Sequence, residues 1–166
     1  MSGWKKNFPN VAPAFGERAS DMAATPIKRL KLVARDAADL KILSACLQDS
    51  VMKVADMAHM KDARRFVLML NRYCWENREH AMRTRTAVQI VGVENIQVRN
   101  INQQRGDAVL SVLALEFMPD DAPAGTMNII FSGGGEIRLA VEACEAILED
   151  ISDAWQARST PSHDID

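Results

Sequence analysis

The spacing of apolar residues predicts a strand followed by a helix at the start of the regularly patterned part of the chain. The segment 29–34 alternates between apolar and polar positions, which predicts a short strand. Asp36 stands where a helix N-cap is expected, and three leucines at helical spacing after it predict a helix over 37–48. A strand–helix unit is therefore expected before the longer run of strands.

A series of strands with short connections follows this helix. The predicted strands are 50–58, 65–75, 86–93, 96–101, 108–118 and 126–132. The first half of 65–75 is apolar at every position, which is typical of a central strand covered on both faces. Short strand-to-strand connections require antiparallel neighbours, because parallel pairing needs a longer crossover. We therefore expect an antiparallel sheet.

A second helix is predicted at the end of the pattern, over 140–156. Its apolar residues step by three and four positions and form one stripe, with acidic residues on the other side. The stripe consists of Val141, Cys144, Leu148, Ile151 and Trp155. The predicted fold class is thus α+β, a bent antiparallel sheet or partly open barrel with a helix near the N-terminus and an amphipathic C-terminal helix. Its nearest common shape is a pleckstrin-homology-like roll.

The length of 166 residues fits one domain. Residues 1–28 contain prolines and no steady period, so we expect a disordered tail there, a globular domain over 29–157, and a second tail over 158–166. The fractions of hydrophobic residues (48%) and charged residues (25%) are close to the globular average, so a core can form without metal or disulfides.

Charge and cysteine usage narrow the class of protein. The net charge of −2 argues against a strongly basic nucleic-acid binder, although a local basic patch is compatible with it. The chain has no run of 18 apolar residues, so no membrane span is expected. Cys46, Cys74 and Cys144 are odd in number and have no CxxC spacing, which argues against a disulfide framework or a structural zinc site. We expect a cytoplasmic protein.

The segment LQDSVMKVADMAHMKDARRFVLMLNRYCWE (47–76) resembles an uncharacterised bacterial family known only as a domain of unknown function. The resemblance continues from about Leu30 to the predicted final helix, and its most specific parts are LQDSV and RRFVLMLNRYCWE. It implies a short cytosolic protein whose gene often lies beside the gene for histidinol dehydrogenase. It implies no catalytic residue that could be transferred to this chain.

Known catalytic motifs are absent from the sequence: it has no GxSxG, HExxH, GxxxxGK[ST] or GxGxxG. A nucleophile–base pair of Cys74 and His80 with Glu76 as orienter is conceivable, but Cys74 ends an apolar strand, where a core role is the simpler interpretation. A metal site from Asp56, His59 and His80 matches no usual ligand spacing. We therefore expect no catalytic residues, metal or cofactor.

One basic surface is predicted if the strands form a plain up-and-down meander. Alternate connections then lie at the same end of the sheet, and one end collects arginines beside a glycine-rich loop. The candidate ligand-binding residues are Arg78, His80, Arg83, Arg85, Arg105, Gly133, Gly134 and Gly135. Arginine forks match phosphate and carboxylate groups, which favours a phosphate-bearing ligand or an acidic partner.

The leading interpretation is a non-enzymatic binding or regulatory module that takes an anionic ligand or acidic partner at this surface. Two alternatives stay open at this point. The first is a small enzyme that uses Cys74 and His80 in a pocket, and the second is a structural subunit of a larger complex. An idle, solvated arginine loop would also explain the charge pattern.

Overall fold

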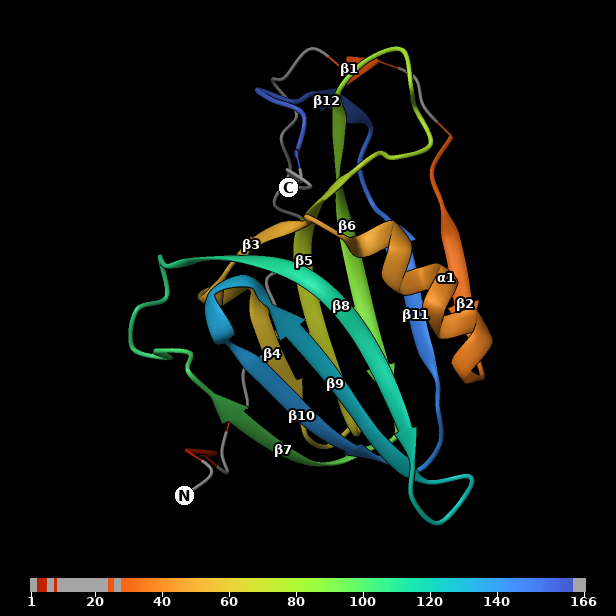
Figure 1. Cartoon of the computed structure of the whole chain (residues 1–166), viewed down its shortest axis with the longest axis vertical. Coiled ribbons are helices and arrows are strands. Elements are labelled where there is room, and N and C mark those ends of the chain that lie inside the picture. Colours follow the sequence, from red (N-terminus) through yellow and green to blue (C-terminus); the bar gives the residue numbers. More distant parts are fainter. Residues whose placement is uncertain (1–2, 6–7, 9–23, 26–27, 163–166) are drawn as a thin grey trace.

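The computed structural model describes residues 3–5, 8, 24–25 and 28–162. In these residues twelve strands belong to one continuous sheet, and one α-helix lies on it (Figure 1). In chain order the elements are β1 (Ala24–Thr25), β2 (Lys31–Ala34), α1 (Ala37–Leu47), β3 (Val51–Lys53), η1 (Val54–Asp56), β4 (Met57–Met60), β5 (Arg65–Tyr73), β6 (Met82–Val91), β7 (Val93–Arg99), β8 (Val109–Pro119), β9 (Gly125–Phe131), η2 (Ser132–Gly134), β10 (Glu136–Val141), β11 (Ala146–Asp150) and β12 (Ala154–Gln156).

Every pairing between these strands is antiparallel, which confirms the predicted antiparallel sheet. The hydrogen-bonded order is β1-β12-β6-β5-β3-β8-β9-β10-β7, with β11 between β2 and β6 and with β4 beside β5. The strands bend around a shared interior and leave β1 and β7 as the two ends of this order (Figure 1). The sheet is therefore strongly bent and open.

The core lies inside the bend, between β5 and β6 on one side and β8, β9 and β10 on the other. Strand β5 passes through the interior of the molecule, where every residue from Phe66 to Leu70 is at most 3% exposed. This confirms the prediction of a central strand covered on both faces. By contrast, β10 alternates between buried and half-buried residues, because only one of its faces meets the core.

Helix α1 confirms the predicted helix over 37–48. Asp36 is its N-cap, and its Oδ1 accepts a hydrogen bond from the backbone N–H of Asp39 at 2.7 Å. In return Asp39 Oδ2 accepts from the backbone N–H of Arg35 at 3.1 Å, which fixes the entry into the helix. The three leucines of the predicted stripe are buried and face β2 and β8.

The predicted C-terminal helix is wrong, because residues 140–156 form the end of β10 and the strands β11 and β12. The apolar residues also obey a period of two on each side of a turn at 142–143, so that Cys144, Ala146 and Leu148 share one buried face. Cys144 and Leu148 are four residues apart, a spacing that suits both a helix turn and a strand. The segment forms a strand because β11 pairs with β2 and with β6. The C-terminal helix expected for a pleckstrin-homology-like roll is therefore not present in the described residues.

The plain meander is also wrong. Strand β7 pairs with β10 and not with β8, so the connection 100–108 crosses past β10 and β9 to reach β8. The predicted strand 50–58 is divided into β3 and β4 by the 3-10 turn η1, and β3 joins β5 to β8. Local patterns of apolar and polar residues do not indicate these changes, because each depends on pairing between distant segments.

Near the N-terminus, the described residues 3–5 and 8 lie against the sheet. Lys5 and Val98 exchange two backbone hydrogen bonds of 2.8 Å at the outer edge of β7. Phe8 is 8% exposed and packs edge-on against Phe66 with ring centroids 5.3 Å apart. Most of the predicted tail 1–28 lies outside the described residues, as does the end of the second one. Across the described residues, no helix is long and apolar enough to cross a membrane.

Candidate functional site

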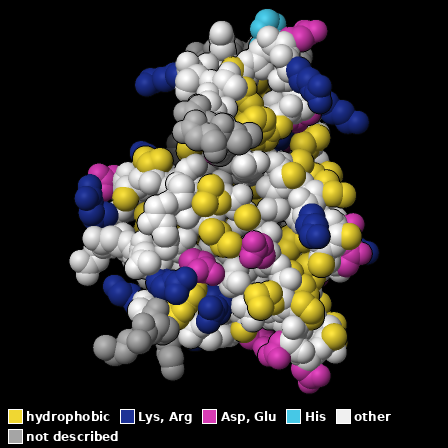
Figure 2. All heavy atoms as spheres, viewed as in Figure 1, with side chains coloured by type: hydrophobic (Ala, Val, Ile, Leu, Met, Phe, Trp, Pro, Cys, Tyr) yellow, Lys and Arg dark blue, Asp and Glu magenta, His cyan; other side chains and the backbone are white. Residues whose placement is uncertain are grey.

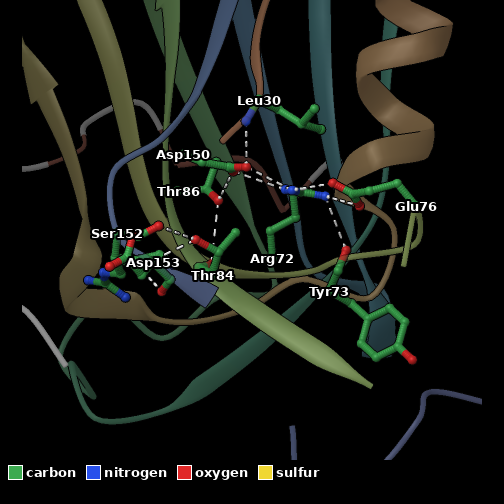
Figure 3. Close-up of polar contacts among 10 residues, drawn as sticks. Leu30, Arg72, Tyr73, Glu76, Thr84, Thr86, Asp150, Ser152 and Asp153 are labelled. Carbon is green, nitrogen blue, oxygen red and sulfur yellow. Dashed lines mark hydrogen bonds and ion pairs between the residues drawn. The ribbon is translucent and has the colours of Figure 1, made fainter. Parts of the chain in front are cut away.

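An arginine of the central strand is buried in the interior and is hydrogen-bonded to two carboxylates (Figure 3). Arg72 is 1% exposed. Its Nε and Nη2 donate to the two oxygens of Asp150 at 3.0 and 2.8 Å, and Nη1 and Nη2 donate to the two oxygens of Glu76 at 3.0 and 2.9 Å. Nη1 also donates to the carbonyl oxygen of Tyr73 at 3.3 Å. All five N–H groups of the guanidinium thus have an acceptor.

Asp150 is equally well satisfied, at the end of β11. Its Oδ1 accepts from Arg72 and from the Thr86 hydroxyl at 2.8 Å, and its Oδ2 accepts from Arg72 and from the backbone N–H of Leu30 at 2.9 Å. Four donors therefore fill the acceptor positions of this carboxylate. The network ties β5, β6, β11 and the segment before β2 to one another.

The electrostatics of the cluster favour a permanently charged arginine. Burial lowers the pKa of Arg72, but the hydrogen bonds and charges of Glu76 and Asp150 outweigh burial and raise the pKa above its ordinary value. One guanidinium and two carboxylates leave a formal charge of −1 on the three side chains. Because a buried charge without a partner is costly, the two carboxylates stabilise Arg72 in the interior.

Glu76 is the member of the cluster that reaches the surface, on the α1 side of Arg72 (Figure 3). Its side chain is 37% exposed, whereas those of Arg72 and Asp150 are 1% and 2% exposed. Each Glu76 oxygen accepts one hydrogen bond from Arg72 and keeps further acceptor capacity. The carboxylate is therefore held in place by Arg72, while part of the side chain stays exposed.

A pocket of about 440 Å³ opens beside Glu76, between α1 and the end of β5. We call it the α1 pocket. Its lining residues are Leu30, Lys41, Ile42, Ala45, Cys46, Arg72, Trp75 and Glu76. Ile42 and Trp75 are 63% and 36% exposed, and Figure 2 shows hydrophobic side chains at the surface over α1. The Trp75 Nε1 donates to the carbonyl oxygen of Gln48 at 2.9 Å, which fixes the indole as one wall.

The thiols of the region are protonated rather than activated. Burial raises the pKa of Cys46, which lines the α1 pocket, and raises that of Cys74 to about 11. Cys74 is 0% exposed, and His80 lies on the exposed loop after it, where its backbone N–H donates to the Asn77 side chain at 3.2 Å. A nucleophilic cysteine needs a lowered pKa, so the geometry gives the conceivable Cys74–His80–Glu76 arrangement no support.

Two of the sequence-predicted binding residues, Arg83 and Arg85, lie close together on one face of β6. Arg83 Nη1 donates to the carbonyl oxygens of Asp49 and Asn71 at 3.2 and 3.1 Å, and its guanidinium lies 5.5 Å from the centre of the Tyr73 ring. Burial lowers the pKa of Arg83. These contacts give Arg83 a structural task.

Arg85 is less firmly held. Its Nη1 donates to Asn71 Oδ1 at 3.2 Å, and its Nη2 lies 3.6 Å from Asp56 Oδ2, too far for a good hydrogen bond. A second hollow of about 350 Å³ lies in front of it. The lining residues are Val51, Met52, Lys53, Asp56, Asn71, Arg85 and Val109. This hollow was not recognised from the sequence.

The other predicted binding residues are distributed over three connections. Arg78 and His80 are exposed on the β5–β6 loop at the top of Figure 1, and Arg105 is exposed on the β7–β8 connection at its left. Gly133, Gly134 and Gly135 form the β9–β10 turn, where positive φ angles of 81° and 91° explain the first two glycines. The Asn100 side chain donates to the Gly134 carbonyl at 3.2 Å. Strands β3 and β8 separate the β5–β6 and β9–β10 hairpins, so a single compact rim does not form.

For metals, the described residues contain no group of three or more His, Cys, Asp or Glu side chains placed to hold an ion. Met52, Met57 and Met69, whose thioethers could bind a soft metal ion, are 3–4% exposed and pack in the interior. The methionines of these strands therefore serve as core residues.

Residues 30–163 match the family described as protein of unknown function (DUF2948). The chain belongs to this family. No curated protein and no solved structure matches the chain. The match begins where the resemblance was expected to begin, at Leu30, and it includes all members of the buried cluster and of the α1 pocket. Both features thus lie in the part of the chain that defines the family.

Arg72 and Asp150 were not expected as site residues, although the sequence contains a signal for each. Arg72 lies in β5, two positions after a run of five apolar residues, and Asp150 continues the buried face of Ala146 and Leu148. A charged residue on the apolar phase of a strand predicts a buried partner of opposite charge. What the sequence could not tell is which of its 22 acidic residues that partner is.

Proposed function

We propose that this chain is a non-enzymatic binding module and that the α1 pocket holds its ligand. One observation carries the proposal. An apolar pocket of about 440 Å³ lies over an ion cluster whose buried members have all their hydrogen bonds made. Small-molecule sites are typically 300–1,000 Å³, mostly apolar, with a few fixed polar groups, and this pocket has that form.

Rigidity supports binding. Arg72, on the floor of the pocket, is hydrogen-bonded on both sides, and Trp75, in its wall, is hydrogen-bonded to Gln48. Floor and wall are therefore ordered before a ligand arrives. A preformed pocket loses little conformational entropy on binding. The neighbouring thiols have raised pKa values, which suits a binding site better than a nucleophilic one.

A direct test is the binding of the uncharged apolar dye N-phenyl-1-naphthylamine to the purified chain, followed by its fluorescence. Ala45→Phe should fill the pocket and abolish the enhancement. Ala38→Phe is the matched control, because Ala38 is an exposed residue of the same helix that does not line the pocket. Absence of dye binding to the unmodified chain, or equal binding to the two variants, would overturn the proposal.

The hollow at Arg85 supports a second candidate, the anionic ligand or acidic partner expected from the sequence. Arg85 has a long contact to Asp56, and Lys53 and Asn71 lie beside it, which is a suitable donor set for a phosphate group. Inorganic phosphate titrated by NMR should shift Arg85 side-chain signals in the unmodified chain but not in Arg85→Gln. Identical shifts in Arg78→Gln and the unmodified chain complete the control, and uniform shifts in all three would contradict a phosphate site.

Three further expectations from the sequence stay proposals. They are a cytoplasmic location, a bacterial source, and a role as subunit of a larger complex. The exposed Ile42 and Trp75 are compatible with the last of these, since exposed apolar side chains often mark a contact surface.

A further inference from the structure

We propose that the ligand of the α1 pocket is a small aliphatic primary amine whose ammonium group is bound by Glu76. The inference rests on the proposed function, because it names the chemistry of the ligand for the same pocket. The proposed cationic ligand differs from the anionic ligand expected at the arginines. It is inferred from the hydrogen-bonding groups that are still available at the pocket.

Apart from the exposed ammonium of Lys41, the N–H donors of the lining side chains Arg72 and Trp75 are already used. Arg72 has given all five N–H groups to Asp150, Glu76 and Tyr73. The indole N–H of Trp75 is bonded to the Gln48 carbonyl. A ligand that needs donors, such as a carboxylate or a phosphate, would therefore have to break an existing buried hydrogen bond in order to obtain one at the floor, which costs free energy.

Among the carboxylates of the cluster, by contrast, acceptor capacity remains on one. Asp150 is filled by four donors and is nearly inaccessible. Glu76 accepts only one hydrogen bond from Arg72 per oxygen, its side chain is 37% exposed, and it is one of the residues that line the pocket. The polar feature that the floor offers to a ligand is thus a fixed carboxylate, and a fixed carboxylate binds an N–H or O–H donor, most strongly a charged one.

The charges around the pocket agree with a cationic ligand. Arg72, Glu76 and Asp150 sum to −1, and burial keeps the Cys46 thiol in its neutral form by raising its pKa. Lys41 is the remaining charged side chain of the lining, and it is exposed on α1. Its methylene stem can form part of the wall while its ammonium stays in water, where its repulsion is screened.

The apolar lining determines the rest of the ligand. Leu30, Ile42, Ala45 and the Trp75 ring offer walls for an alkyl chain, and no described lining side chain other than those of the cluster and Lys41 carries a charge. Each buried methylene should tighten binding about fourfold until the pocket is filled. An amine with a chain of several carbons therefore combines both recognition features.

Isothermal titration calorimetry with n-octylamine, 1-octanol and octanoate tests whether the α1 pocket of the purified chain prefers an amine. The three probes share one alkyl chain and differ in the end group. We expect octylamine to bind at least tenfold more tightly than octanoate, with octanol between them. If none of the three binds, the proposed function itself fails. If octanol or octanoate binds as tightly as octylamine, the pocket is retained and the amine inference is overturned.

Two variants locate the effect. Glu76→Gln removes the negative charge and should bring octylamine to within about threefold of octanol, whereas Glu79→Gln, on an exposed residue of the same loop that does not line the pocket, should change nothing. Lys41→Gln, which leaves the buried cluster intact, should strengthen octylamine binding and weaken octanoate binding. An amine preference that survives Glu76→Gln in a folded protein, or a Lys41→Gln effect of opposite sign, would overturn the inference.

Discussion

Arg72 and Asp150 are seventy-eight positions apart in the chain and meet in two parallel hydrogen bonds in the interior. Their side chains are 1% and 2% exposed, so the pair is removed from water almost completely. Glu76 completes the coordination of Arg72 from the side of α1. The arrangement joins β5, which carries Arg72, to β11, which carries Asp150. Arg72 and Glu76 also form the floor of the α1 pocket.

The cost of breaking this pair is the first prediction. Asp150→Asn should lower the free energy of unfolding by about 3–5 kcal/mol, because it leaves the guanidinium without a charged partner on its most buried side. The loss also affects the hydrogen bonds from Thr86 and Leu30. Urea unfolding followed by circular dichroism measures the change.

Asp153→Asn is the matched control for this experiment. Asp153 pairs with Arg29 at 3.0 Å, but both side chains are more than half exposed, at 67% and 53%. Exposed pairs contribute only about 0–1 kcal/mol. A stability of Asp150→Asn equal to that of Asp153→Asn would show that the buried pair contributes nothing.

Thiol reactivity gives the second prediction. In the folded protein, N-ethylmaleimide should modify Cys46 first, because Cys46 is half-buried at the α1 pocket while Cys74 and Cys144 are buried. Burial raises the pKa of all three, so the rate at Cys46 should increase steeply as the pH rises from 7 to 9. Mass spectrometry of the digested protein assigns the modified residue.

The same reaction reports on the pocket. Octylamine at saturating concentration should protect Cys46, and Cys46→Ser should remove the fast phase without changing the slow ones. Rapid modification of Cys74 before Cys46 under native conditions would contradict the burial that the structure assigns to Cys74.

Docking of the N-terminal residues is the subject of the third prediction. Phe8 packs on Phe66, and the Trp4 ring lies 4.5 and 4.2 Å from the guanidinium carbons of Arg99 and Arg138. Phe8→Ala should destabilise the protein by about 1–3 kcal/mol, less than a truncation deep in the core, because the segment can detach instead of leaving a cavity. Urea unfolding measures this change.

Acrylamide quenching of tryptophan emission separates detachment from general loosening. Quenching should increase in Phe8→Ala, and the increase should vanish in Trp4→Phe/Phe8→Ala, where the reporter at position 4 is gone. An increase of the same size in the double variant would place the change at Trp75 or Trp155 and contradict local detachment.

The fourth prediction concerns pH. Burial, and to a lesser degree the charge of Lys61, lowers the pKa of His59 in the folded state. The unfolded chain then binds a proton first, near pH 6.5, so the stability present above that pH should decline as the pH falls through the lower folded value. The urea midpoint measured between pH 7.5 and 5.5 should show the decline.

His59→Gln should flatten this part of the profile, and His80→Gln, at an exposed histidine of the β5–β6 loop, is the matched control. A midpoint that rises as the pH falls through 6.5 would contradict the sign, since it would require a raised pKa in the folded state.

What the sequence alone determined was local. The N-cap at Asp36 and the leucines after it specify α1, and the unbroken apolar run of β5 specifies a strand covered on both faces, because both signals depend on neighbours within a few residues. The period of 65–75, 108–118 and 126–132 likewise located β5, β8 and β9 to within a few residues. Membership in the family was recognisable for the same reason, from a continuous segment of residues.

Only the tertiary structure decided the rest. The positions of Cys144 and Leu148 suit a helix and a strand equally, and the pairing of β11 with β2 and β6 selected the strand. The candidate site likewise depends on the pairing of the strands. The acidic residue that neutralises Arg72 in the interior is fixed by which strands pair, and that choice depends on the burial of the whole core at once, which no local spacing of residues records.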